Sequence, residues 1–500
     1  MRRRGPKSWP VSPASAKFNS IFATMTILDN KTTLLEGLVF GQRVAEEEPR
    51  LEEYFVETLL WRKILRGEID IVYGMKGSGK SAIFHLLAAG RDVPANVTII
   101  PAENPRGTPV FDAIKTDPPP SETQFVYLWK LYILSLVANN SEILEILKRD
   151  HHELIAELNA AGVVGTDKGE ILKKALKYVD SIKVPNIVEV GISHSQEEDK
   201  KINVDRAMDV LNQVLLKKRN TVWVLFDRLD SVFDDSSSLE ENALRALFKT
   251  YRDFSKYNCI KLKIFLRTDI WATLTCKGFR EASHITQSAT IEWSEANILN
   301  LIVRRLLNNP ELVVFYGVAP EQVLANFNEQ KKLFYRIFPD QIDAGSRKSE
   351  TIRWMMTRVA DGTQQLAPRE LIHLLNQSKD EQIKASELGE SAPDGEHLFS
   401  PSAMKRALPA VSQVRLEQTI FAEYPNSREH ILMLEGEKAT QTLDTLSKIW
   451  NVDEGGALKI ASTLVEIGFF ELRGDKRRPE YWVPFLYRPH LKLIQGRAEE

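Results

Sequence analysis

Short apolar runs alternate with helix-like patterns along the first half of the chain. The apolar runs lie at 69–73, 97–100, 221–226, 260–266 and 289–293. Runs of this length, bounded by turn residues, are typical of buried strands. Helical spacing of apolar residues is found at 34–67, 81–89, 122–182, 204–218 and 239–257. This alternation predicts an α/β fold with a parallel sheet covered by helices on both faces.

After residue 293 the pattern is helical almost to the end, with polar breaks at 343–350 and 386–397. Polar stretches that carry Gly, Ser and Pro are common at domain boundaries, and we place a boundary in the second break. The domains that we predict are a disordered arm over 1–33, an α/β core over 34–293 with a helical insertion at about 122–203, a helical domain over 294–385, a linker and helical segment over 386–437, and a C-terminal domain over 438–500. The first 17 residues are basic and rich in Pro and Ser. They belong to that arm, or they are translated from an upstream start codon while Met25 is the functional first residue.

Composition and charge narrow the class of protein. Of the 500 residues, 43% are hydrophobic and 27% charged, which is typical of globular domains and excludes a wholly disordered or collagen-like chain. The 66 Lys and Arg residues nearly balance the 68 Asp and Glu residues, so any basic surface must be local. The two cysteines, Cys259 and Cys276, cannot form a disulfide framework or a four-cysteine zinc site, and they favour a cytoplasmic protein.

No apolar run reaches the roughly 18 residues that a membrane helix needs. The best candidate, 126–138, is too short and contains Lys130. It is better explained as a buried core helix, and we expect no membrane partner. The sequence His151-His152-Glu153 lacks the spacing of a metal site, so we interpret it as a solvated helix face.

A phosphate-binding loop is predicted between the first strand and the next helix. The sequence fits G-x-x-x-x-G-K-[ST] at every fixed position, and the residues predicted to hold the nucleotide are Gly74, Met75, Lys76, Gly77, Ser78, Gly79, Lys80 and Ser81. Glycines allow backbone N–H groups to wrap a phosphate, and the following helix N-terminus favours the anion. Lys80 would reach the β- and γ-phosphates, and Ser81 would ligate Mg²⁺. A glycine-rich turn without a ligand is the alternative, which the flanking strand and helix disfavour.

Another predicted strand ends in the carboxylate that a phosphate-binding loop needs to hold its metal ion. The run 221–226 ends in Asp227, which we predict to hold Mg²⁺ together with Ser81. Many ATPases place Glu directly after this Asp to polarise the attacking water, but here that residue is Arg228. Asp230 is the nearest acid that could do so. It could equally be a helix N-cap, and the sequence leaves both roles open.

The C-terminal domain shows the order of a winged helix: helices at 442–451 and 456–468, then strands at 469–473 and 480–487. The turn between the strands is basic, and the side chains that could neutralise DNA phosphates non-specifically are Arg473, Lys476, Arg477 and Arg478. The second helix has only Lys459 as a basic residue and few side chains suited to base edges. A protein-contact module is therefore the favoured interpretation, with non-specific DNA binding as the alternative.

Several motifs together resemble a known class of ATPases. Residues from about 40 to 376 resemble STAND/AAA+-type P-loop ATPases in the neighbourhood of the Orc1/Cdc6 initiators, and also a little-characterised bacterial P-loop ATPase family. The motifs that carry the resemblance are Phe40-Gly41 followed by Ala45-Glu46, GMKGSGKS, LFDRLD, FLRTDIW and APRELIHLL. Arg228 in place of Glu departs from AAA+ proteins, and we expect slow hydrolysis.

The resemblance implies further features. The sheet would have the strand order 5-1-4-3-2 of the ASCE division, followed by a helical lid and a winged helix. Arg267, at the end of the strand after the acidic one, would sense the γ-phosphate; a surface arginine is the alternative. Arg369, near the start of a lid helix, would point back at the nucleotide, whereas for Arg304 and Arg305 we prefer a solvated helix face. Phe40-Gly41 would lie near the base.

The function predicted from these residues is that of a Mg-ATP-dependent ATPase whose slow hydrolysis moves the lid and winged helix. No Asn-Lys-x-Asp element selects guanine, which favours ATP and ADP over GTP as ligands. ATPases of this kind often act in genome maintenance or anti-phage defence. The alternative is a nucleotide-stabilised scaffold that recognises DNA or a protein partner without turnover. An arginine supplied by a neighbouring subunit would require an oligomer, and the sequence marks no such residue.

Overall fold

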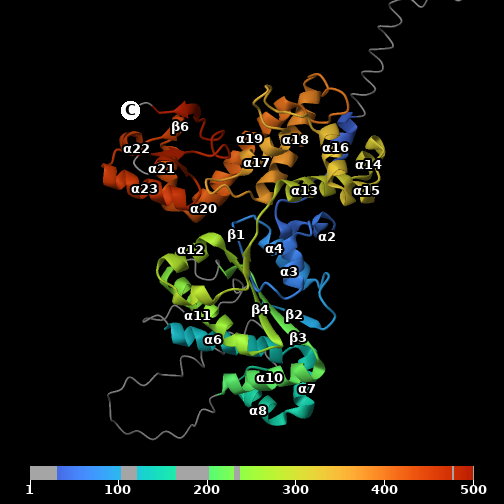
Figure 1. The fold of residues 1–500 in the computed structure, drawn as a ribbon, viewed down its shortest axis with the longest axis vertical. Coiled ribbons are helices and arrows are strands. Elements are labelled where there is room, and N and C mark those ends of the chain that lie inside the picture. Colours follow the sequence, from blue (N-terminus) through green and yellow to red (C-terminus); the bar gives the residue numbers. More distant parts are fainter. Residues whose placement is uncertain are drawn as a thin grey trace, which may run out of the picture. The chain divides into compact units, whose positions relative to one another are not determined.

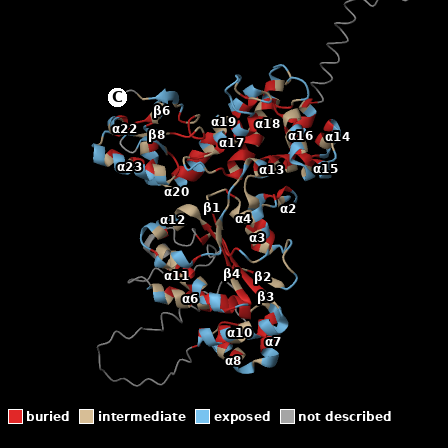
Figure 2. Cartoon of the chain, viewed as in Figure 1, coloured by how far each residue is buried: buried red, intermediate tan, exposed pale blue. Residues whose placement is uncertain are grey.

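In the computed structural model, residues 31–102, 121–160, 162–164, 202–229, 237–475 and 478–498 are described. The chain divides into two compact units (Figure 1). The sheet unit is Glu57–Glu292, and the helical unit joins the segment that ends at Val56 to Trp293 and the residues after it. Each unit has its own hydrophobic core, visible as the buried interior of each half in Figure 2.

The sheet unit is built on a five-stranded sheet in the order β2-β3-β4-β1-β5. Its strands are β1 (Ile71–Gly74), β2 (Val97–Ala102), β3 (Thr221–Phe226), β4 (Ile260–Arg267) and β5 (Ser288–Thr290). All neighbouring strands pair in parallel. The predicted P-loop fold with strand order 5-1-4-3-2 is therefore confirmed. The strand expected at 289–293 ends earlier, at Thr290.

Helices flank this sheet. They are α3 (Leu59–Leu65), α4 (Lys80–Ala88), α6 (Glu122–Ala138), α7 (Ser141–Asp150), α8 (His152–Ala160), α10 (Val204–Lys218), α11 (Ser237–Asp253) and α12 (Thr268–Cys276). The apolar run at 126–138 lies in α6, which is buried along most of its length, and Trp129 Nε1 donates to the Ala243 carbonyl at 2.8 Å. In the described part of the chain, no helix is both long and apolar enough to cross a membrane.

The helical unit contains a helix over 31–37 and then η1 (Ala45–Glu47), α2 (Leu51–Tyr54), α13 (Glu295–Leu307), α14 (Pro310–Tyr316), α15 (Pro320–Ala325), α16 (Phe327–Ile337), α17 (Thr351–Val359), α18 (Pro368–Glu387), α19 (Pro401–Arg415), α20 (Phe421–Glu423) and α21 (Arg428–Leu432). The polar break predicted at 386–397 coincides with the connection between α18 and α19. These two helices pack against each other, so the break marks a turn inside one compact unit.

The C-terminal module, residues 438–498, completes the helical unit. It comprises β6 (Lys438–Gln441), α22 (Leu443–Trp450), α23 (Glu454–Glu466), β7 (Glu471–Asp475), β8 (Arg478–Trp482) and β9 (Ile494–Arg497). The sheet order is β7-β8-β6-β9, with β7 and β8 antiparallel. Both predicted helices and the hairpin are present, but the second hairpin strand ends at Trp482 rather than residue 487. Pro484, which lacks a backbone N–H, follows shortly after.

Candidate nucleotide site

The glycine-rich loop joins the end of β1 to the start of α4. Gly77 and Gly79 have φ values of 81° and 106°, in the left-handed region that other residues avoid. A Cβ at Gly74 would collide with the Ser78 hydroxyl. Glycine is therefore required at three positions of the motif for the chain to turn tightly into α4. A loop of this kind that leads into a helix N-terminus forms an anion-binding site.

Lys80 lies over the start of this loop. Its Nζ donates to the Gly74 carbonyl at 2.8 Å and to the Met75 carbonyl at 3.0 Å. Both acceptors are uncharged, so phosphate oxygens would be stronger partners for the ammonium group. The Ser78 N–H also donates to the Met75 carbonyl, at 3.2 Å, which tightens the turn.

Asp227 directly follows β3, and its side chain contacts Ser81 at the end of the glycine-rich loop. Its side chain is buried and accepts a hydrogen bond from the Ser81 hydroxyl. Burial raises the pKa of Asp227, against the opposing effects of Ser81, the Arg228 N–H and the Lys80 charge. Although β4 separates β1 from β3, the structure thus brings Lys80, Ser81 and Asp227 together. A hydroxyl beside a carboxylate is a donor set that suits Mg²⁺.

The residues after Asp227 depart from the usual pattern of ATPases. Arg228 adopts a left-handed conformation, with φ of 56°, and its N–H donates to the Asp227 carboxylate. It occupies the place where a catalytic Glu is common and cannot accept a proton there. Asp230 lies outside the described residues, so both of its suggested roles stay predictions.

Arg267 ends β4 at the same edge of the sheet. It lies in register with Gly74, the first residue of the loop motif, on the adjacent strand. Its Nε donates to Asp269 Oδ1 at 3.1 Å, and its Nη2 donates to Asp269 Oδ2 at 2.6 Å. The role of γ-phosphate sensor stays a prediction. The ion pair with Asp269 was not predicted.

Arg369 is the second residue of α18, in the helical unit. Its Nε is buried and has no hydrogen-bond partner in the part of the chain that is described. The next residue, Glu370, is buried and accepts from Arg415 Nη1 at 3.0 Å. Arg415 Nη2 reaches Asp361 Oδ2 at 3.4 Å, and its guanidinium also interacts with Tyr487 in the C-terminal module. Burial raises the pKa of Asp361, with Arg415 opposing the shift.

Arg304 and Arg305 lie in the last turns of α13. Arg304 is half-buried, and its Nε donates to Asn300 Oδ1 at 2.8 Å. Arg305 is only 5% exposed, with its guanidinium 4.3 Å from the centre of the Tyr54 ring and Nη1 3.6 Å from Glu48 Oε2. The solvated face that we expected is therefore wrong for Arg305. A carboxylate and an aromatic ring allow it to be buried as a structural residue.

The Phe40-Gly41 motif belongs to the helical unit and contacts the helix that carries Arg369. Phe40 is fully buried, and its carbonyl accepts a hydrogen bond from Arg305 Nη1. Gly41 has φ of 80°, and Asn376 Nδ2 on α18 donates to its carbonyl at 3.1 Å. A Cβ at Gly41 would collide with the Tyr54 ring and the Arg305 guanidinium, so glycine is required there.

The wing cations are only partly described. Arg473 Nε donates to Glu471 Oε1 at 2.6 Å, and its guanidinium stacks on Trp482, 3.4 Å from the ring centre. Arg478 is exposed at the start of β8. Lys476 and Arg477 lie outside the described residues. Binding of DNA by the wing stays a prediction, with one of its four cations already paired.

No protein-family model and no curated protein matches the sequence. Among solved structures, the Orc1 protein of Aeropyrum pernix in complex with DNA is similar over 90% of this chain and 96% of its own, at 12% identity and a TM-score of 0.35. A Walker-type ATPase of Pyrococcus abyssi is similar over 91% and 98%, at 9% identity and a TM-score of 0.40. The Orc2 protein of A. pernix, in ADPNP–ADP complexes, is similar over 86% and 91%, at 11% identity and a TM-score of 0.41. These three solved structures are thus two Orc proteins and a Walker-type ATPase.

Proposed function

We propose that this protein binds Mg-ATP at the glycine-rich loop and hydrolyses it slowly. The observation that supports the proposal is the convergence of Lys80, Ser81 and Asp227 at the carboxyl edge of the sheet. Lys80 and Ser81 are adjacent in the loop motif, and Asp227 comes from a distant part of the sequence. Together they supply the ammonium, hydroxyl and carboxylate groups that a magnesium–phosphate complex requires. ATP and ADP are the ligands, with Mg²⁺ as the cofactor.

Each residue has a distinct task in this proposal. Loop N–H groups and Lys80 bind the phosphates, while Ser81 and ionised Asp227 hold Mg²⁺, which supplies positive charge toward the transferred phosphoryl group. Arg267 contacts the γ-phosphate. Slow turnover is expected because Arg228 occupies the place of the usual water-polarising Glu. Asp230 remains our candidate for that task.

We also propose that the lid helices and the C-terminal module move together. They share one hydrophobic core, and Arg415 links Glu370, next to Arg369, with Tyr487 of the module. The Gly362 N–H donates to the Gly468 carbonyl at 2.7 Å, and a Cβ at Gly362 would come within 2.8 Å of that oxygen. A change at Arg369 would therefore reach the rest of the helical unit.

The C-terminal module is best explained as a winged helix. Its support is the order strand, helix, helix and hairpin, in which β6 pairs with the second hairpin strand, β8. We propose a role in genome maintenance or anti-phage defence, with a protein partner on the module and non-specific DNA binding as its alternative. A gel shift with duplex DNA over a salt series separates these, because binding through phosphates weakens steeply as salt rises.

Steady-state ATPase assays of Lys80→Ala and Asp227→Ala test the catalytic proposal. Both substitutions should reduce turnover at least about 100-fold, because each removes a group that acts on transition-state charge. Lys218→Ala, an exposed lysine on α10, is the matched control and should keep wild-type turnover. Unchanged turnover in the two site variants would refute the assignment.

The second candidate function is a binding module that holds ATP or ADP as a structural ligand. Arg228 favours this candidate, because it replaces the usual water-polarising Glu and an arginine cannot serve as a general base. Purified protein that retains nucleotide, and that melts higher with nucleotide but shows no turnover, would support this candidate. Turnover that depends on Lys80 would exclude it.

A further inference from the structure

We propose that Asp269 is a positioning residue that orients Arg267 toward the γ-phosphate and so sets the preference of the chain for ATP over ADP. The inference rests on the proposed nucleotide site and adds to it the residue that controls the sensor. Asp269 lies in the motif FLRTDIW, but the sequence predicts no role for it, because an acid two residues after a strand end has no distinctive pattern.

The pairing geometry is the first support. Both carboxylate oxygens of Asp269 accept from the guanidinium of Arg267, at 3.1 Å from Nε and 2.6 Å from Nη2. A two-point contact of this kind fixes the plane of the guanidinium, whereas a single contact leaves it free to rotate. The side chains of Arg267 and Asp269 are 15% and 34% exposed, so solvent only partly screens the pair.

The sheet fixes the backbone of Arg267, so only its side chain can change conformation when a ligand binds. Arg267 pairs in register with Gly74, so its Cα lies beside the start of the phosphate loop. An arginine side chain loses considerable conformational entropy when it is ordered for a ligand. Asp269 lowers that cost, because the two contacts restrict the guanidinium before phosphate arrives.

Asp269 is itself held in place by the first turn of α12. The Thr273 hydroxyl donates to the Asp269 carbonyl at 3.0 Å. Trp271, two residues further along, stacks on Tyr73 with ring centres 5.0 Å apart. Tyr73 immediately precedes Gly74, so the turn that carries Asp269 is attached to the strand that leads into the phosphate loop.

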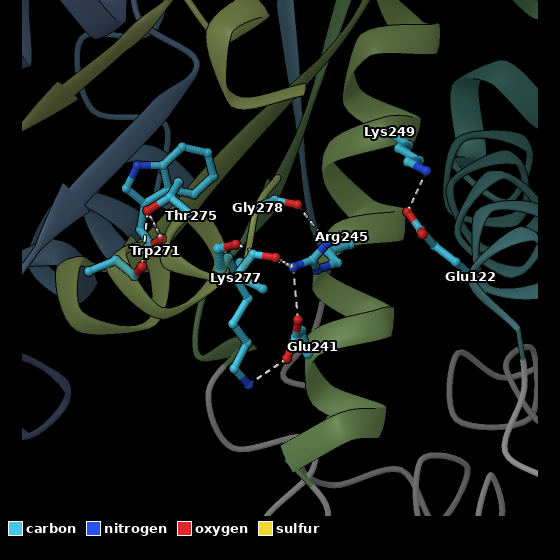
Figure 3. Close-up of polar contacts among 10 residues, drawn as sticks. Glu122, Glu241, Arg245, Lys249, Trp271, Thr275, Lys277 and Gly278 are labelled. Atoms are coloured by element: carbon cyan, nitrogen blue, oxygen red, sulfur yellow. Dashed lines mark hydrogen bonds and ion pairs between the residues drawn. The ribbon is translucent and has the colours of Figure 1, made fainter. Parts of the chain in front are cut away.

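The far end of α12 is held by α11 (Figure 3). Arg245 donates to the Gly278 carbonyl at 3.3 Å and to the Leu274 carbonyl at 3.4 Å, which satisfies acceptors at the end of the helix. Glu241 pairs with Arg245 at 2.8 Å and with Lys277 at 2.7 Å. Because α12 is held at both ends, its orientation carries Asp269 to a defined place beside Arg267.

The contact between Asp269 and Arg267 should affect the binding of ATP but not that of ADP. ADP lacks the γ-phosphate, so a residue that acts only through a γ-phosphate contact leaves ADP binding unchanged. Asp269 accepts from two different nitrogens of the guanidinium and thereby restricts the orientation of the whole group. Loss of Asp269 should therefore weaken ATP binding selectively, although it removes a negative charge from the neighbourhood of the site.

The test compares the affinities of the full chain for ADP and for a non-hydrolysable ATP analogue, both with Mg²⁺, by titration calorimetry. The variants are Asp269→Asn, Asp269→Ala, Arg267→Ala and the double variant Arg267→Ala with Asp269→Asn. Asp269→Asn should weaken the analogue about fivefold and Asp269→Ala somewhat more, since one carboxylate oxygen is imitated by the amide. ADP affinity and the melting temperature should stay at wild-type values. Asp209→Asn, an exposed acid on α10, is the matched control.

The double variant decides whether Asp269 acts through Arg267. If it does, adding Asp269→Asn to Arg267→Ala changes nothing further. Additive losses, an equal loss of ADP affinity, or an unchanged analogue-to-ADP ratio in Asp269→Asn would overturn the inference. A wild-type chain that binds neither nucleotide would overturn the proposed site and this inference with it, whereas binding without hydrolysis would refute only the proposed turnover.

Discussion

The two ends of β1 carry the same pair of residue types and use them differently. At its start, Asp70 and Lys263 bind each other at 2.8 Å, and both are almost completely buried. At its end, Lys80 donates to backbone carbonyls, and Asp227 accepts from Ser81 and a backbone N–H. The first pair stabilises the fold. The second pair also contacts neutral groups, which charged phosphate and metal can replace.

The surroundings of the two lysines reinforce this contrast. Lys263 also donates to the Ile69 carbonyl at 2.7 Å and lies 4.2 Å from the centre of the Trp223 ring, while Tyr251 donates to the other oxygen of Asp70 at 3.3 Å. Burial lowers the pKa of Lys263, although Asp70 opposes the shift. Its charge is thus committed to partners inside the fold. Lys80, by contrast, is only partly buried and stands at the start of α4, directly after the glycine-rich loop.

The largest predicted effect is on stability at the start of β1. Lys263→Met should reduce the free energy of unfolding by about 3–5 kcal/mol, because it leaves Asp70 buried without its partner. The double variant with Asp70→Asn should recover part of the loss, since no uncompensated charge then remains. Urea unfolding followed by circular dichroism measures both. A loss under about 1 kcal/mol for the single variant would show that the pair is not structural.

The second largest predicted effect is on ATP turnover, and it concerns Lys80 near the end of β1. Lys80→Ala should reduce ATP turnover at least about 100-fold, equivalent to roughly 2.7 kcal/mol of transition-state stabilisation. Its unfolding free energy should differ from the wild type by less than about 0.5 kcal/mol, because the loop carbonyls that it leaves can bind water. Measuring both quantities on one preparation checks the contrast. Equal damage to stability would mean that Lys80 and Lys263 serve the same purpose.

Local sequence patterns marked the residues that the structure brings together at the end of β1, but not the buried ion pair at its start. Gly74, Lys80 and Ser81 stand in one continuous motif, and Asp227 is marked by the apolar run before it, so spacing alone located them. Lys263 is one of two lysines in β4, and its partner is visible only once β1 and β4 are in register. Such cross-strand pairs depend on which strands are neighbours, information that no short pattern carries.

A smaller effect concerns ligand-dependent stability. At about ten times its dissociation constant, Mg-ATP should raise the unfolding free energy of the wild type by about 1.4 kcal/mol, because it binds only the folded chain. The same concentration should leave Lys80→Ala almost unchanged. Lys263→Met should still be stabilised by nucleotide wherever it remains folded, since its defect lies at the other end of β1. Thermal shift assays with and without Mg-ATP measure this stabilisation in the wild type and in both variants. A shift in Lys80→Ala equal to that of the wild type would contradict the proposed site.

The smallest effect concerns the pH dependence of stability at Asp227. Because burial raises the pKa of Asp227, the folded state holds its proton to higher pH than the unfolded state does. Folding stability therefore falls as pH rises through that window, and at neutral pH the ionised carboxylate is a cost to the fold. Asp227→Asn should remove this cost and raise the unfolding free energy by about 1 kcal/mol or less, while it abolishes Mg²⁺-dependent turnover. The gain should disappear as the pH falls to about 4, the ordinary pKa of aspartate in an unfolded chain, because the protonated Asp227 of the wild type then resembles the amide. Asp70→Asn is the control and should destabilise the protein at neutral pH, because Lys263 loses its counter-charge. Destabilisation by Asp227→Asn at neutral pH would mean that both carboxylates are structural, and the contrast between the two ends of β1 would fail.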